Sequence, residues 1–310
     1  MSEVQTLIQT NGHVIEADEL AELMSNLKTA NDVACITSPR PISDLKQLLN
    51  DRAKALKASF CQACAERDEL GGAELFCQIA KGEIVYDNAS KDWLFYNGLY
   101  WQEDRKSDIP TLAASVLSGV FYRLAAEKYK ELMELKAEHG KPETMAPEDK
   151  QAEDEAKRAK EAAEHAAENF YNLRFVRNVL TFASAGEMLG VGGDEWDRQR
   201  HLLCVANAVI DLRTGKPTPP RHDQYIRTVA PVSYEPGATC PTWQEALLGI
   251  HAGDQAMIGY IQRFLGYAMS AECTEVNFDI WFGKDGQNGK EWTLELIQAV
   301  LGSQLCGPIE

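Results

Sequence analysis

The sequence predicts a mixed α+β fold that is predominantly α-helical. Apolar residues recur at helical spacing over long stretches, above all between residues 109 and 175, where we expect a long helical hairpin. Short aromatic and alternating runs predict β-hairpins between the helical segments. Near the C-terminus, a strand-like run, a Gly-rich loop and a helical segment follow one another over 278–301, which is the order of an α/β unit.

Composition and charge limit the classes of protein to consider. The chain has 310 residues, 45% hydrophobic and 25% charged, as is typical of a folded chain. The 31 Lys and Arg face 47 Asp and Glu, so the net charge is −16. This argues against nonspecific DNA binding over the whole surface, although a local basic groove is compatible with it. No secretory signal opens the chain, and no apolar run approaches the ~20 residues that cross a bilayer, so we expect a cytoplasmic protein without membrane contact.

The N-terminal part is expected to be helical, followed by a β-hairpin. We expect a helical segment over 1–70, in which residues 42–65 have helical spacing and Gly71-Gly72 ends the pattern. Strand-like runs follow at 83–86 and 92–96. Asn97-Gly98 then precedes a third aromatic run, and this dipeptide is a strong hairpin signal because both residues tolerate positive φ.

The helical hairpin is expected to consist of two helices, at 109–137 and 149–175, separated by Gly and two Pro residues. The second helix carries a narrow seam of small and apolar residues: Ala152, Ala156, Ala159, Ala163, Ala166, Phe170 and Leu173. From residue 131 to residue 168 there are 12 acidic and 6 basic residues. We favour a solvated hairpin closed by Ala contacts, and the alternative is an arm that binds a partner.

The second half alternates short strands and helices. A loop is expected at 190–194, one or two buried strands at 201–213, and a turn at 214–217. Helices are expected at 242–250 and at 255–269, the latter capped by Asp254. A strand over 278–282 and a helix over 291–301 enclose the Gly-rich loop.

This Gly-rich loop carries the most informative pattern in the chain. Its candidate phosphate-binding residues are Gly283, Asp285, Gly286, Gln287, Asn288, Gly289, Lys290 and Glu291. Glycines allow backbone N–H groups to surround phosphate oxygens, and Lys290 would reach the β- and γ-phosphates. The first glycine is one place early, and Glu291 stands where a hydroxyl would bind Mg²⁺. Glu291 is a weak candidate metal ligand, since hard cations take oxygen ligands. The alternative is an ordinary strand-to-helix turn with a surface lysine.

From about Gly71 onwards, the chain resembles phage and plasmid primase-helicases, which are similar to the poxvirus primase-helicase and belong to helicase superfamily 3. No single piece is specific, but six occur in the family's order. They are residues 72–76, 93–101, 205–215, 234–243, 262–268 and 286–290.

The resemblance implies three regions: an N-terminal helical segment 1–70, a primase-helicase N-terminal-like domain 71–245, and the start of an α/β ATPase domain at 246–310. It implies ATP and Mg²⁺ as cofactors, a homo-oligomeric ring with six subunits as the specific expectation, and single-stranded DNA and a primase or another replication partner. A bacterial host cell and a phage or mobile-element origin are also implied. The family's Mg²⁺-binding acids, sensor and arginine finger would lie beyond residue 310, so we expect a chain that ends soon after its phosphate loop.

The sequence is therefore compatible with two hypotheses about function. The first is part of an ATP-dependent DNA helicase with a degenerate phosphate loop. In it, Arg213, Lys216, Arg221 and Arg227 are candidates to face DNA, because they lie in a basic stretch outside the acidic hairpin. The second is a non-catalytic oligomerisation or interaction module derived from such a helicase, which binds or regulates a replication partner. Glu291 favours the second reading and the loop 286–290 the first.

Overall fold

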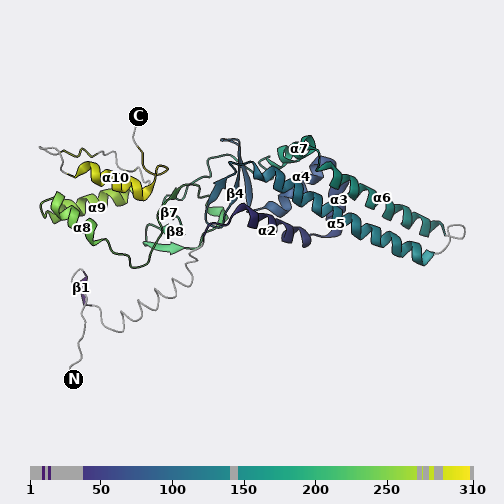
Figure 1. Ribbon diagram of the computed structural model, residues 1–310, viewed down its shortest axis with the longest axis horizontal. Coiled ribbons are helices and arrows are strands. Elements are labelled where there is room, and N and C mark those ends of the chain that lie inside the picture. The colour runs from purple at the N-terminus through teal and green to yellow at the C-terminus, as the bar shows by residue number, and fades with distance from the viewer. Residues whose placement is uncertain are drawn as a thin grey trace, which may run out of the picture. The chain divides into compact units, whose positions relative to one another are not determined.

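The computed structural model describes two short strands near the N-terminus, at 9–10 and 13–14, and then residues 38–139, 146–270, 274, 279–282 and 289–307. The chain divides into two compact units. The helical unit comprises Pro39–Arg198 and His222–Arg227, and the second unit comprises Met1–Ser38, Gln199–Arg221 and Thr228–Glu310. The elements confirm the predicted α+β class with mostly helices (Figure 1). The predicted domain 71–245 contains residues of both units.

Six helices form most of the helical unit. They are α2 (Ile42–Lys54), α3 (Ala58–Ala65), α4 (Asp68–Ala80), α5 (Asp108–His139), α6 (Pro147–Asn169) and α7 (Leu173–Ala183). Leu49, Phe76, Leu117 and Val179 lie fully buried in one apolar cluster to which all six helices contribute. In Figure 1, α5 and α6 run side by side and extend beyond α3, α4 and α7, as the sequence predicted for a hairpin.

Three helix boundaries differ from the sequence prediction. The expected helix 42–65 is two helices, because the chain turns after Lys54. The expected helix 149–175 ends at Asn169, and α7 begins anew with Asn172 as N-cap, whose side chain accepts a hydrogen bond from Arg174 N. Gly71 and Gly72 do not end a helix but lie buried inside α4.

A sheet of four strands packs beside these helices, in the order β5-β4-β3-β6. Its strands are β3 (Ile84–Asp87), β4 (Asp92–Tyr96), β5 (Trp101–Glu103) and β6 (Gly190–Val191). The predicted hairpin at Asn97-Gly98 is confirmed, with Tyr96 opposite Trp101. Asn97 is fully buried, and its Oδ1 accepts hydrogen bonds from Leu99 N and Tyr100 N. The expected loop 190–194 instead begins with β6, which pairs in parallel with β3.

The helix α5 is, by length and composition, the one helix among the described residues that could cross a membrane. More than half of its apolar stretch, 56%, is buried inside the protein, where Val116, Leu117 and Phe121 pack in the core cluster. This helix is the core helix of the helical unit, and its apolar character serves packing between helices.

Among its described residues, the second unit contains a four-stranded sheet, a two-stranded pair near the N-terminus and three α-helices. The strands β7 (Leu202–Val205), β8 (Ala208–Asp211) and β9 (Lys216–Thr218) form an antiparallel meander, and β10 (Val229–Ala230) pairs in parallel with β7. The helices are α8 (Pro241–Ile250), α9 (Gln255–Met269) and α10 (Lys290–Leu301). The predicted strands at 201–213 and the Asp254 cap of α9 are confirmed. The strands β1 (Gln9–Thr10) and β2 (His13–Val14) pair with each other, where a helical segment was expected.

Candidate functional site

The first turn of α10 is the part of the predicted phosphate loop that the structure describes. Gly289 is the N-cap residue and has a left-handed backbone, with φ of +77°. A Cβ atom at this position would lie 2.6 Å from Ile250 Cδ1 at the end of α8, so a glycine is required here by both conformation and space. Lys290 is the first helical residue and is half-buried, and Glu291 follows it in the first turn, exposed to solvent.

Thr293 stabilises this first turn of α10 with its side chain. Its side chain is 2% exposed, and its Oγ1 donates a hydrogen bond to Gly289 O at 2.8 Å. Because the backbone N–H groups at the start of a helix are not used within the helix, they give the turn a positive electrostatic potential. Lys290 adds a full positive charge there, and Glu291 adds a negative one beside it. The turn can therefore attract an anion, although the negative charge of Glu291 opposes this attraction.

Trp292 extends the contact between α10 and α8. Its ring centre lies 5.7 Å from that of Trp243, with an angle of 36° between the two ring planes. Trp292 is still 44% exposed. The described part of its surroundings is thus the contact with α8. No local sequence pattern connects these two tryptophans, because they are 49 positions apart in the chain.

The remaining predicted loop residues, Gly283, Asp285, Gly286, Gln287 and Asn288, lie outside the described residues. The prediction of a strand over 278–282 is wrong for residues 279–282, which the structure describes and which are not in a strand. Ile280 and Phe282 are 78% and 86% exposed, and Asp279 Oδ1 instead accepts a hydrogen bond from the Tyr260 hydroxyl of α9. A strand needs a neighbouring strand to satisfy its backbone, and none pairs with 279–282 among the described residues.

The basic residues predicted to face DNA occupy three different environments. Arg213 and Lys216 lie at the turn between β8 and β9, both exposed, with Lys216 opposite Asp211 in the register. Arg213 makes a two-pronged ion pair with Asp211, at 3.0 Å from Nε to Oδ1 and 2.7 Å from Nη2 to Oδ2. These hydrogen bonds lower the pKa of Asp211 to about 2. Arg221 is exposed further along the same unit.

Arg227, the fourth of these residues, lies in the helical unit and contacts two carboxylates. Its Nη1 donates to Asp87 Oδ2 at 3.1 Å, its Nη2 donates to Glu103, and its guanidinium lies 5.8 Å from the Trp196 ring centre. Hydrogen bonds from Arg227 hold the pKa of Glu103 below its ordinary value. The structure therefore brings Arg213 and Lys216 together, while the charge of Arg227 is balanced within its own unit.

The buried Asp87 is the centre of a partly exposed polar network that includes Arg227. Burial raises the pKa of Asp87, but hydrogen bonds from Ala89 N, Ser90 and Trp196 outweigh this effect, and the pKa lies below its ordinary value. The carboxylate is therefore ionised at neutral pH. The network attaches residues 222–227 to the sheet, where Trp101 Nε1 also donates to His222 O at 2.8 Å. Its role in the observed geometry is to hold this segment in the helical unit.

Together these features define a class of protein: an α+β module with a helical hairpin, joined to a unit in which α10 opens with a glycine and a lysine. A family model described as "D5 N terminal like" matches residues 73–251, which is more than half of the chain. The chain belongs to this family, the N-terminal region of D5-like primase-helicase proteins of phages and viruses, which act in DNA replication. No curated protein matches the chain.

Proposed function

We propose that this chain forms part of an ATP-dependent superfamily 3 DNA helicase associated with priming, and that it binds the phosphates of Mg-ATP at the start of α10. The observation that carries the proposal is the left-handed Gly289 directly before Lys290 at a helix N-terminus, in a chain of the D5 N-terminal-like family. In this proposal Lys290 contacts the β- and γ-phosphates, and Gly283, Asp285, Gly286, Gln287 and Asn288 contribute loop contacts.

Mg²⁺ would complete the nucleotide site. Bound Mg²⁺ neutralises phosphate charge and prefers oxygen ligands. Glu291 lies in the first turn of α10, carries such oxygens and is exposed. The same carboxylate repels the phosphates when no metal lies between them. We therefore propose that nucleotide binding at this turn depends on Mg²⁺ more strongly than it would with a neutral hydroxyl residue at 291.

The further elements of the proposal concern assembly and DNA. We propose a homo-oligomeric ring, with a hexamer as the specific expectation, that acts on single-stranded DNA with a primase or another replication partner in the cytoplasm of a bacterial host. Arg213 and Lys216 support a DNA contact, because both are exposed at one hairpin turn. Arg213 also pairs with Asp211, but its side chain is 67% exposed, whereas that of Arg227 is 28% exposed and contacts both Asp87 and Glu103. Arg227 is therefore less supported, and the exposed Arg221 stays a candidate.

Calorimetric titration of Mg-ATP into the full chain tests the nucleotide proposal. We expect binding that disappears in Lys290→Ala and becomes tighter in Glu291→Ser. Glu295→Ala, which removes an exposed carboxylate one turn further along α10, is the matched control and should leave binding unchanged. Absence of binding in the wild-type chain would contradict the proposal.

A second candidate function is a non-catalytic oligomerisation or interaction module that binds or regulates a replication partner. Glu291 favours it, because a carboxylate in the first turn occupies the electrostatic position that a phosphate would use. If neither the wild-type chain nor Glu291→Ser binds Mg-ATP, while the chain still assembles in light scattering, this second function is supported.

A further inference from the structure

One side of the helical hairpin exposes a row of large side chains from α5. Tyr122, Tyr129 and Met133 are separated by seven and four residues, so they lie on one face of the helix. They are 41%, 50% and 40% exposed. Tyr171, just beyond α6, is 78% exposed and lies close enough to Tyr122 to raise the pKa of the Tyr122 hydroxyl. We call these four residues the hairpin stripe.

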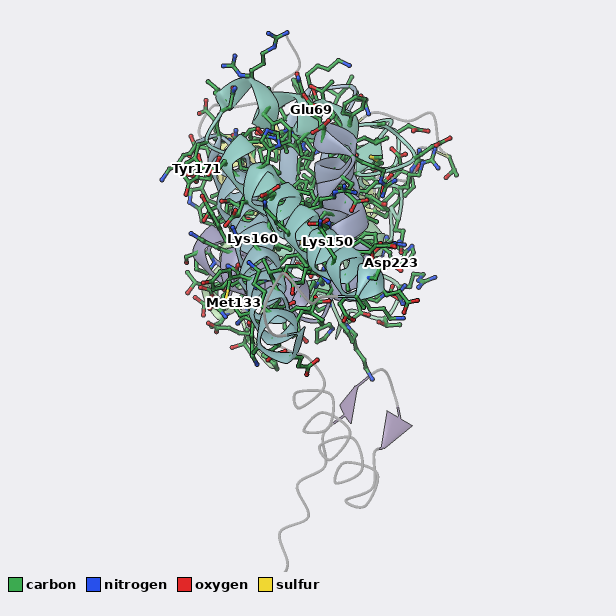
Figure 2. All side chains as sticks on the ribbon, turned by 90° about the vertical axis from the view of Figure 1, so that its right-hand side faces the viewer. Glu69, Met133, Lys150, Lys160, Tyr171 and Asp223 are labelled. Carbon is green, nitrogen blue, oxygen red and sulfur yellow. The ribbon has the colours of Figure 1, made fainter. Side chains whose placement is uncertain are left out.

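The adjoining edge of α6 is charged and mostly acidic. Lys160 Nζ lies 6.0 Å from the centre of the Tyr129 ring and pairs with Glu164 at 2.8 Å. The pKa of Tyr122 is raised first by Tyr171 and by burial, and then by the charges of Glu168 and Glu164. These two carboxylates therefore lie near Tyr122, while Lys160 lies near Tyr129. In Figure 2, which looks along the hairpin, Tyr171, Lys160 and Met133 lie to the left and Lys150 to the right.

The stripe differs from the rest of the hairpin surface. Among the described residues of α5 and α6, the large hydrophobic side chains that are exposed are Tyr122, Tyr129 and Met133, and all three belong to the stripe. Single exposed apolar residues are normal on any surface, but an aligned group is a feature of interaction sites. Tyr and Met are also enriched at protein interfaces, where they supply contact area.

The charge of the hairpin indicates the kind of partner. Over residues 126–139 and 147–169 there are 12 Asp and Glu against 7 Lys and Arg. A basic surface would therefore approach this side faster and bind more specifically than an acidic one. The stripe is long and narrow, with apolar positions at helical spacing, which suits a helix laid along it.

We propose that the hairpin stripe binds a basic amphipathic helix of a partner protein. The apolar face of that helix covers Tyr122, Tyr129 and Met133, and its Lys and Arg side chains lie toward Glu164 and Glu168. This interaction is independent of nucleotide binding at α10 and of DNA binding by Arg213 and Lys216. It gives the hairpin the role of a docking arm in addition to its role in the core.

Fluorescence anisotropy with the full chain tests this directly. The probe is a fluorescein-labelled helical peptide of Leu and Lys, with Leu at helical spacing on one face. A peptide of the same composition in scrambled order, which has no apolar face, is the control for nonspecific charge attraction. We expect the ordered peptide to bind at least about tenfold more tightly than the scrambled one.

Surface variants locate the binding. The double variant Tyr129→Ser with Met133→Ser should lower the affinity for the ordered peptide about tenfold or more. The matched control is Lys130→Ser with Glu134→Ser, an exposed i,i+4 pair on the adjoining face of the same helix, which leaves the net charge unchanged. Glu164→Gln with Glu168→Gln should weaken binding and reduce its salt dependence. Because all these side chains are at the surface, circular dichroism should show that the variants remain folded.

Three results would overturn the proposal. The scrambled peptide binding as tightly as the ordered one would show charge attraction alone. If the Tyr129→Ser, Met133→Ser variant bound the ordered peptide as tightly as the wild-type chain does, the peptide would bind outside the hairpin stripe. Self-association of the chain in sedimentation velocity that is lost in that variant would show that a second copy of the chain, and not a basic partner, occupies the stripe.

Discussion

Arg227 and the buried Asp87 form a partly buried ion pair, with 3.1 Å between Nη1 and Oδ2, although 140 residues separate them in sequence. Asp87 is 1% exposed. Because an unpaired buried charge is costly, Arg227→Ala should lower the free energy of unfolding of the helical unit by about 3 kcal/mol. Urea unfolding followed by circular dichroism measures this. Arg198→Ala, which breaks the exposed pair with Asp194, is the control and should cost less than about 1 kcal/mol. Equal losses in the two variants would contradict the expectation.

The same network predicts how stability depends on pH. The pKa values of Asp87 and Glu103 in the folded chain lie below their ordinary values of 3.8 and 4.5. Their contribution to stability is therefore complete above those ordinary values and is lost as the pH falls through the lower folded values. We expect the difference in melting temperature between wild type and Asp87→Asn to be largest near pH 7 and to shrink below pH 3.8. A difference that stays constant down to acid pH would argue against the ionised network.

The start of α10 predicts opposite effects for two glycine substitutions. Gly289→Ala should destabilise the second unit by about 1 kcal/mol or more, because Gly289 has positive φ and its Cβ would collide with Ile250. Gly266→Ala, at an exposed position in α9 with open space around the Cβ, should stabilise by up to about 1 kcal/mol. Thermal unfolding followed by tryptophan fluorescence compares them. Similar changes in both variants would be inconsistent with the left-handed turn.

The outer part of the helical hairpin should be dispensable for folding. Residues 131–156 contain only two buried hydrophobic side chains among those described, Leu132 and Ala156, whereas Phe121, Ala163 and Phe170 lie deeper in the core cluster. Replacing 131–156 by a short Gly-Ser linker should therefore lower the melting temperature only slightly. The same shortening should remove Met133 and, with it, part of the hairpin stripe. Loss of cooperative unfolding would show that the arm is needed for the core.

The β8–β9 turn predicts a salt-dependent contact with nucleic acid. Arg213→Ala with Lys216→Ala should weaken binding of a fluorescent single-stranded oligonucleotide and reduce the slope of log affinity against log salt by about 1.5. Lys157→Ala with Arg158→Ala, which removes two exposed basic residues from the acidic hairpin, is the control and should change neither quantity. Identical behaviour of the two double variants would exclude this turn as a DNA contact.

The sequence by itself determined the elements whose signals are local. Asn97-Gly98 places a turn between β4 and β5, and the spacing of Ala156, Ala163 and Ala166 predicts a helix that packs closely on another. The start of α10 was also predictable, because a glycine that precedes a helical pattern marks a helix end within a few residues of sequence. In each case the interactions that decide the structure lie within one or two turns of the chain.

The tertiary structure alone decided features that depend on distant contacts. Gly71 and Gly72 read as a break in the sequence, yet they lie inside α4, since a Cβ on Gly71 would be 2.0 Å from Cys64 O and one on Gly72 would be 3.0 Å from Val179 Cγ2. Helices that approach so closely leave no room for a side chain, and this need appears only when both helices are in place. Likewise, Arg227 was a candidate for DNA by its charge, but its position beside Asp87 and Glu103 gives that charge a partner within the protein. Long-range packing and ion pairing leave no local signal in the sequence, because the fold determines which distant residues come into contact.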